Sequence, residues 1–386
     1  MDCSLRLADR DCNAAKLGIV DFLKQDEIGA CIQNRDRHIP IILSRLRFTG
    51  GHRLLCVFER DVLCGARHVF SLSELQFESP IWYSDYMALE IGQIRHVGLF
   101  TPRLEEHARF YCDVWGLDKV EERIDSVFLR GSSPERFILS LHHSVRRGLH
   151  HIAYAMPDDD AVRRAAARLR DAGVRIVEGP HDLEEPGGGY GLRFVDLDGR
   201  CIELSSNVPA HSDGWRAKNV EPRSVCHIVV NTPDLERITN FYTSVLGFRI
   251  SDWSGGQMAF LRTDSKHHNI SFNAAPHASV NHVAYLVSGV DEVMRGISNL
   301  RKHGIEPAWG PGRHGPGNNI FCYFNDPFGY VAEYTSDIDY ISDESKHEPK
   351  VWPRSPESMD RWGVASPPSP ELRAAMTGEP DSGWVL

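Results

Sequence analysis

The chain has 386 residues, 41% of them hydrophobic and 25% charged, which is an ordinary globular composition and excludes a disordered or collagen-like chain. Its formal net charge is −10 and no basic run accumulates, so a nucleic-acid-binding surface is not expected. No stretch reaches the roughly 18 apolar residues of a membrane span, and the N-terminus lacks a secretory signal pattern. The nine cysteines are odd in number and lack C-x-x-C spacing, which favours a reducing cytoplasm over a disulfide framework or a thiolate zinc site.

The first 86 residues differ from the rest of the chain. They match no other segment, show no clear periodicity and contain five of the nine cysteines. Met87 stands directly before the first apolar strand of the part that follows. We hypothesise that Met87 is the biological start and that residues 1–86 are an N-terminal extension from an over-extended reading frame. A genuine but divergent extension is the alternative.

An internal repeat sets the organisation of the remaining chain. The segment Arg95–Pro102 recurs as Cys226–Pro233, so that His96 corresponds to His227 at an offset of 131 residues. After one deletion the offset becomes 130 and aligns Asp196 with Asp326. A match over more than a hundred residues predicts two domains of one fold. We place them at 91–207 and 222–341, with a linker at 208–221.

Each copy contains two similar units. A unit opens with a short apolar strand and continues with an amphipathic helix, such as Asp160 to Ala172, in which apolar residues recur at helical spacing. Turn signals then lead into three further strands. The order β-α-β-β-β is thus predicted four times, at about 91–145, 148–207, 222–275 and 280–336. Short strands that return after one helix predict an α+β fold of curved mixed sheets.

The C-terminal segment, residues 342–386, is rich in proline and charge. We expect an irregular strap with one short helix around Pro370 to Met376.

Three residues of the second copy suggest a metal site. His227, His282 and Glu333 each fall within a strand-like apolar run, where a carboxylate is rarely buried unless it is paired or bound to a metal. Two imidazoles and one carboxylate form the facial triad of non-haem Fe(II) centres, and the same donors suit Mn(II). A lone strand histidine is more often a hydrogen-bonded core residue. Three such residues at repeat-related positions favour the metal.

The first copy carries the same three residue types, His96, His151 and Glu203. The two histidines are 55 residues apart in each copy, as 151 − 96 and 282 − 227 show. The triad alone therefore does not decide which half is active, and a second, structural metal in the first copy stays open. We interpret His142, His143 and His150 as surface residues or as residues around the site.

The C-terminal half carries a more specific pattern, Gly312-Arg313-His314, then Tyr323, then Asp326-Pro327-Phe328-Gly329 and Glu333. With this pattern the sequence resembles the vicinal oxygen chelate superfamily and, within it, the two-domain type I extradiol ring-cleavage dioxygenases, over about residues 91–341. The resemblance implies two tandem domains, each of two βαβββ modules. It also implies a metal in the second domain and a first domain without catalytic function.

The resemblance assigns roles to individual residues. His227, His282 and Glu333 would be the metal ligands. His267 or His268 matches the catalytic histidine, with His268 preferred, while His314 matches a substrate-side histidine and Tyr323 the substrate-binding tyrosine. In the first copy the counterpart of His268 is Phe137 and that of Tyr323 is Arg193. A metal there would lack an obvious proton acceptor, which places the chemistry in the second copy.

These assignments predict an enzyme that opens a catechol-type aromatic diol with both atoms of O2 at Fe(II), or alternatively Mn(II), in aromatic catabolism. His268 would accept and return a proton, because the pKa of histidine is about 6.5 when unperturbed. Tyr323 would hold the substrate oxygen. The resemblance also implies a homo-oligomer. The cysteine pattern, the net charge and the lack of a long apolar stretch predict a cytoplasmic protein that uses neither nucleic acid nor a membrane.

Competing interpretations remain for the residues and for the function. His267 and His268 could form an exposed polar turn, Tyr323 could be simple core, and His314 a solvated loop residue. The chain could instead be a glyoxalase-like lyase or isomerase, or a metal-free sequestering protein of the same fold. A relative acting on hydroquinones or on a para-hydroxyphenyl keto acid is a further alternative.

Overall fold

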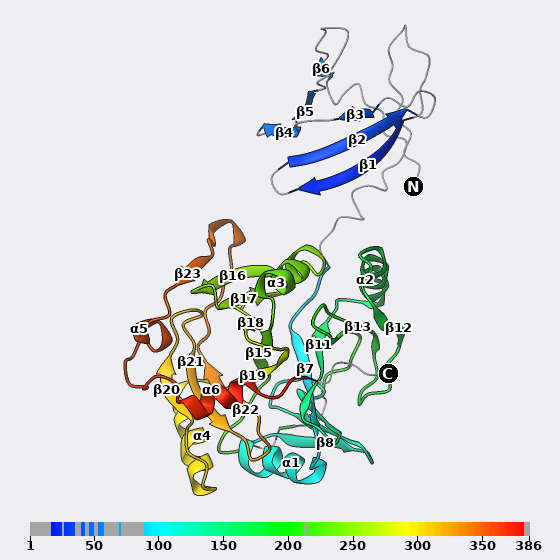
Figure 1. Cartoon of the computed structure of the whole chain (residues 1–386). Helices are drawn as coiled ribbons and strands as arrows, with labels where there is room; N and C mark the ends of the chain where they lie inside the picture. Colours follow the sequence, from blue (N-terminus) through cyan, green and yellow to red (C-terminus); the bar gives the residue numbers. More distant parts are fainter. Residues whose placement is uncertain are drawn as a thin grey trace. The chain divides into compact units, whose positions relative to one another are not determined.

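The computed structural model describes residues 89–211, 214–215 and 217–381, and the backbone of short strands between residues 17 and 70. The chain divides into two compact units, Met1–Met87 and Ala88–Leu386. The first unit contains two three-stranded sheets, of orders β1-β2-β3 and β4-β5-β6 (Figure 1). Their strands are β1 (Leu17–Lys24), β2 (Glu27–Asn34), β3 (Pro40–Ile42), β4 (Leu46–Thr49), β5 (Arg53–Val57) and β6 (Val69–Phe70). The expected start at Met87 lies outside the described residues.

The first domain of the second unit has the expected two modules. The first module comprises β7 (Ile94–Thr101), α1 (Leu104–Phe110), the π-helix η3 (Tyr111–Trp115), β8 (Asp118–Glu122), β9 (Ser126–Arg130) and β10 (Leu139–His143). The second comprises β11 (Gly148–Ala155), α2 (Asp159–Asp171), β12 (Ile176–Asp182), β13 (Tyr190–Val195) and β14 (Cys201–Ser206). Antiparallel pairing of β7 with β11 joins the modules into an eight-stranded sheet of order β12-β13-β14-β11-β7-β10-β9-β8.

The second domain repeats this arrangement. Its elements are β15 (Val225–Thr232), α3 (Leu235–Ser244), β16 (Arg249–Ser254), β17 (Met258–Arg262), β18 (Ile270–Ala274), β19 (Ser279–Leu286), α4 (Val290–Lys302), β20 (Trp309–Arg313), β21 (Ile320–Asn325) and β22 (Val331–Ser336). Pairing of β15 with β19 again joins the modules. The predicted fold class, two tandem α+β domains of curved mixed sheets, is confirmed.

Helix α2 begins where the sequence supplies both a cap and a buried face. Helix α2 begins after Asp158, whose carboxylate accepts a hydrogen bond from the amide of Ala161. Its buried residues include Val162 and Leu169, which recur at helical spacing. The helix spans 159–171, one residue earlier at each end than the sequence predicted. No helix among the residues that the structure describes is long and apolar enough to cross a membrane.

The C-terminal strap has more structure than expected. Besides the predicted helix, α6 (Pro370–Thr377), it contains η4 (Glu344–Lys346), β23 (Lys350–Trp352) and α5 (Pro356–Met359). Strand β23 pairs with β16 and becomes the ninth strand of the second sheet. Ser369 caps α6, and Leu372 on this helix is buried against Phe321 and Tyr323. The strap thus follows the second domain and is anchored to it at two places (Figure 1, orange to red).

The two domains pack through shared aromatic and polar contacts. The indole of Trp115 in the first domain stacks on the ring of Tyr334 in the second, at 3.9 Å and 14°. The Tyr334 hydroxyl donates to the carbonyl of Trp115 at 2.7 Å. The buried His107 ring also lies 2.9 Å from the Asp326 carboxylate across the boundary. Buried residues of both domains therefore belong to one continuous hydrophobic core.

Replacing Trp115 with alanine should lower the free energy of unfolding by about 3–5 kcal/mol, because it removes a fully buried ring and leaves a cavity between the domains. Urea unfolding followed by circular dichroism measures this loss. The matched variant Trp115→Phe keeps an aromatic ring and should lose clearly less. Equal stability of wild type and Trp115→Ala would contradict a shared core.

Candidate metal centre

Three adjacent strands bring His227, His282 and Glu333 together. In the pairing register, Ala284 on β19 lies between His227 on β15 and Glu333 on β22. His282 lies two residues before Ala284 and therefore on the same face of β19. The Glu333 Oε2 atom is 3.3 Å from His227 Nε2 and 3.2 Å from His282 Nε2. The strand order thus brings two imidazoles and one carboxylate together at a single point.

These three side chains fit a divalent metal ion. All are buried, and among the described residues neither His282 Nε2 nor Glu333 Oε2 has a hydrogen-bond partner. Metal–donor bonds of about 2.1 Å at near right angles place two donors about 3 Å apart, close to the observed separations. Asn281 accepts from His282 Nδ1 at 2.8 Å and so turns Nε2 toward the centre. Asn319 donates to the other Glu333 oxygen at 3.3 Å.

The pKa shifts of the three residues describe how their charges are balanced without a metal. Burial lowers the pKa of His227, but the nearby Glu333 carboxylate outweighs it and raises this pKa to about 10. Burial likewise raises the pKa of Glu333, yet His227 and His282 bring it well below its usual range. Burial keeps the pKa of His282 low. In the metal-free protein, a proton on His227 therefore supplies the positive charge that Glu333 requires.

Of the two adjacent histidines before β18, His268 faces the site. It lines the cavity beside the triad, and its ring centroid lies 4.4 Å from that of His227. The pKa of His268 lies well below the usual value because the ring is buried and other histidines surround it. The interpretation of His267 and His268 as an exposed turn is wrong, since they are only 4% and 3% exposed.

His267 has a different environment from its neighbour. Its Nε2 lies 3.1 Å from a carboxylate oxygen of Asp252 on β16, and its Nδ1 lies 2.9 Å from His268 Nδ1. Asp252 also accepts hydrogen bonds from the indole of Trp352 and the amide of Lys350, both on the strap strand β23. Asp252 thus connects the strap to His267.

Tyr323 and His314 form a pair on the other side of the triad. Tyr323 lies opposite Glu333 in the β21–β22 register and lines the cavity. His314 Nδ1 contacts the carbonyl of Met359 at 2.9 Å and must donate to it, which leaves Nε2 to accept from the Tyr323 hydroxyl at 3.0 Å. The His314 ring stacks on Phe321 at 3.9 Å. His314 is therefore a packed and hydrogen-bonded residue, and the solvated-loop interpretation is wrong.

The cavity beside these residues has a volume of about 490 Å³, within the usual range for small-molecule sites. Its apolar walls include Phe260 and Trp309, and the strap closes one side. The strap residues that line it are Pro353, Arg354, Ser358, Met359, Pro368, Arg373, Met376 and Thr377. Sequence reasoning missed these residues, because no repeat or motif signals how an irregular segment folds over a pocket.

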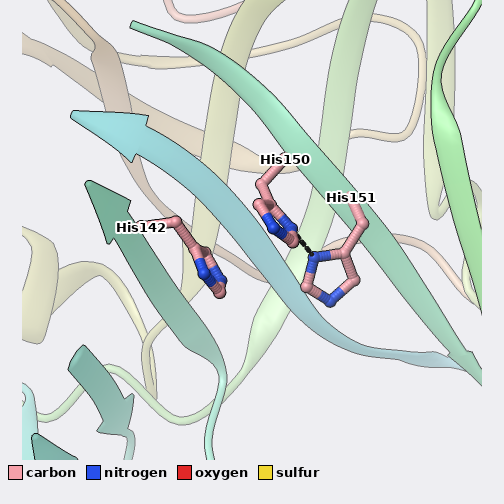
Figure 2. Close-up of side chains that lie close together, drawn as sticks. All are labelled: His142, His150 and His151. Carbon is pink, nitrogen blue, oxygen red and sulfur yellow. Dashed lines mark hydrogen bonds between the residues drawn. The ribbon is translucent and has the colours of Figure 1, made fainter. Parts of the chain in front are cut away.

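The first domain assembles its own triad differently. His96, His151 and Glu203 come together with Glu185, but the adjoining cavity measures only about 10 Å³. A second group, His142 on β10 with His150 and His151 on β11, lies beside it (Figure 2). His142 and His150 are half-buried and their rings stack at 3.7 Å. The first domain therefore offers histidines and carboxylates without room for an organic ligand.

Comparison with known proteins places this fold and site in a family. The family model for the Glyoxalase/Bleomycin resistance protein/Dioxygenase superfamily matches residues 93–204 and 224–334. The chain is 29% identical over 304 residues to metapyrocatechase 2 of Cupriavidus necator, with 72% of this chain and 90% of that protein covered. It is 28% identical over 292 residues to the manganese-dependent 2,3-dihydroxybiphenyl 1,2-dioxygenase of Geobacillus genomosp. 3, with coverage of 69% and 91%.

A solved structure agrees with the family model. The Mn(II)-bound glyoxalase from Novosphingobium aromaticivorans superimposes with a TM-score of 0.69 at 37% identity and covers 73% of this chain and 93% of its own. The matched regions include the residues of both triads. The chain therefore belongs to the glyoxalase/bleomycin resistance protein/dioxygenase superfamily.

Proposed function

We propose that this protein is an extradiol dioxygenase that opens a catechol-type aromatic diol with O2. One observation carries the proposal: the convergent triad of His227, His282 and Glu333 borders a cavity that also exposes His268 and Tyr323. The relatives named metapyrocatechase and 2,3-dihydroxybiphenyl dioxygenase support it. The four described cysteines are free, which fits a reducing cytoplasm, and we expect a homo-oligomer as in the family it resembles.

The triad would hold one divalent ion through His227 Nε2, His282 Nε2 and Glu333 Oε2. We propose Fe(II), with Mn(II) as the alternative that the names of two relatives support. Such an ion supplies Lewis acidity toward both diol oxygens and the electron chemistry that O2 requires. The three side chains come from one face of the sheet, and this face borders the cavity, where a flat diol could lie beside the ion.

The surrounding side chains would transfer protons and orient the substrate. His268 is uncharged because burial lowers its pKa, so its ring can accept a proton from a bound hydroxyl and return it later. Tyr323 would donate its hydroxyl hydrogen to a substrate oxygen beside Glu333. His314 accepts that hydrogen in the empty cavity and positions the phenol through its own bond to Met359. Trp309 and Phe260 would pack against the ring of the substrate and exclude water.

A glyoxalase-like lyase is the second candidate function. The 37% identity to a structure described as a glyoxalase favours it. Such chemistry uses the metal triad but gives no reason for the His268 and Tyr323 groups that flank it. A sequestering protein needs no ligand triad at all. The arrangement of proton-handling groups therefore favours ring cleavage.

Protein loaded anaerobically with Fe(II), and separately with Mn(II), should consume one O2 per catechol when air is admitted and form a yellow ring-opened product. An oxygen electrode and an absorbance trace measure both quantities. Incubation with the hemithioacetal of methylglyoxal and glutathione tests the second function in the same preparation. Turnover of the hemithioacetal without O2 uptake on any catechol would reject the dioxygenase.

Metal binding should release about one proton per ion near pH 8. His227 carries a proton below pH about 10 in the metal-free protein, and only the neutral imidazole binds a metal. Affinity should therefore fall about tenfold for each unit that the pH is lowered from 8.5 to 6.5. Calorimetry in buffers of different ionisation enthalpy measures the released proton. Binding without proton release would contradict the His227–Glu333 ion pair.

Replacing His268 with glutamine should lower kcat by about 10²- to 10⁴-fold, the usual contribution of a general acid–base group, while the metal content stays at the wild-type level. Steady-state O2 uptake and elemental analysis separate the two effects. The matched variant His303→Gln changes an exposed histidine after α4 and should behave as wild type. A fully active His268→Gln enzyme would reject the proton-transfer role.

A further inference from the structure

The first domain keeps a buried triad that has the same construction as the metal centre. Ala153 on β11 pairs with His96 on β7 and with Glu203 on β14, as Ala284 pairs with His227 and Glu333 in the second domain. His151 lies two residues before Ala153, on the same face. The backbone of this domain therefore presents two imidazoles and one carboxylate to a single point.

The difference between the domains lies at one position of the neighbouring strand. Arg193 on β13 lies opposite Glu203, at the place where Tyr323 lies opposite Glu333. The Arg193 guanidinium donates to Glu203 Oε2 from Nε at 2.9 Å and from Nη2 at 2.7 Å. The same Nη2 donates to Glu185 at 2.5 Å. A side chain with a permanent positive charge thus occupies the region beside the carboxylates.

Charge balance explains why this arrangement is stable. A buried carboxylate without a cation is strongly unfavourable, and an arginine supplies a charge that does not titrate near neutral pH. The two imidazoles lie against each other, with 2.6 Å between His96 Nε2 and His151 Nε2. The remaining cavity of about 10 Å³ has room for no more than one water molecule.

We propose that Arg193 takes the place of a metal ion in the first domain and keeps closed a latent divalent-cation site formed by His96, His151, Glu203 and Glu185. Glu203 Oε1 is buried and has no hydrogen-bond partner among the described residues, so this oxygen is available as a metal ligand. Glu185 lies 3.6 Å from His96 Nε2 and 3.8 Å from His151 Nε2. Loss of the guanidinium leaves the buried Glu203 and the half-buried Glu185 without it, and a divalent cation can take its place beside them.

The adjacent histidine group is a poorer place for an ion. His150 Nδ1 and His151 Nδ1 contact each other at 2.6 Å, and the dashed line in Figure 2 marks this hydrogen bond. The rings of His142 and His150 are nearly parallel, at 12°. Ring-nitrogen lone pairs lie in the ring plane, so stacked imidazoles direct them side by side instead of toward one point. The ion would therefore bind at Glu203.

The test uses full-length protein in which the second-domain site is silenced by His227→Gln and Glu333→Gln together. Removing both members of that ion pair avoids leaving a lone buried charge. With Arg193 intact, this background should bind no Mn(II). Adding Arg193→Ala should give one Mn(II) per chain, measured by equilibrium dialysis with elemental analysis, and a melting temperature that rises with Mn(II). Arg193→Gln, which fills more of the volume, should do the same and serves if the alanine variant fails to fold.

Two controls separate charge from space and identify the ligands. Arg193→Lys retains a cation and should bind no Mn(II). Glu203→Gln added to Arg193→Ala should abolish the new site, whereas His142→Gln added to Arg193→Ala should leave it intact. The proposal is wrong if the background with Arg193 binds Mn(II) at Glu203. It is equally wrong if both charge-removing variants fold and bind none, or if the new binding depends on His142.

Discussion

A carboxylate buried on a central strand is the constraint on which each domain depends. Glu203 and Glu333 occupy equivalent places, both inaccessible to water, and each needs a positive partner at its side. The second domain meets this need through His227 and His282, whose proximity lowers the pKa of Glu333. The first domain meets it with Arg193. One fold thus meets the same requirement with histidines beside a cavity of about 490 Å³ and with an arginine beside a cavity of about 10 Å³.

The strap forms one side of the cavity that borders the triad. Helix α6 packs against β21 through Leu372, and β23 extends the sheet beyond β16. The cavity combines apolar side chains such as Phe260 and Trp309 with charged side chains of the strap, Arg354 and Arg373.

Much of this architecture was predictable from the sequence, because each pattern of strands, helices and site residues occurs in both copies of the repeat. The four β-α-β-β-β modules and the triad residues follow from the offset of 131 residues, and strand pairing then leaves little freedom in where His227, His282 and Glu333 meet. Contacts between segments without a common periodicity were not predictable. The bond of His267 to Asp252 and the strap residues along the cavity depend on packing that no local pattern encodes.

Arg193 shows the limit of alignment within the repeat. Its correspondence to Tyr323 in the repeat was readable from the sequence, whereas its bonds to Glu203 and Glu185 emerge only when β13, β14 and the loop between β12 and β13 are placed in space. The side chain of an arginine is long enough to reach many different hydrogen-bond acceptors. Spacing alone therefore identifies the residue without identifying the charge that it neutralises.

Asp252 connects the C-terminal strap to the two adjacent histidines, His267 and His268, beside the pocket. A single carboxylate receives both the anchoring bonds of β23 and the contact that orients His267 against His268. Loss of the β23 contacts would therefore also remove a partner of the carboxylate that holds His267 against His268. The position of the strap and the orientation of the histidine beside the cavity thus depend on the same side chain.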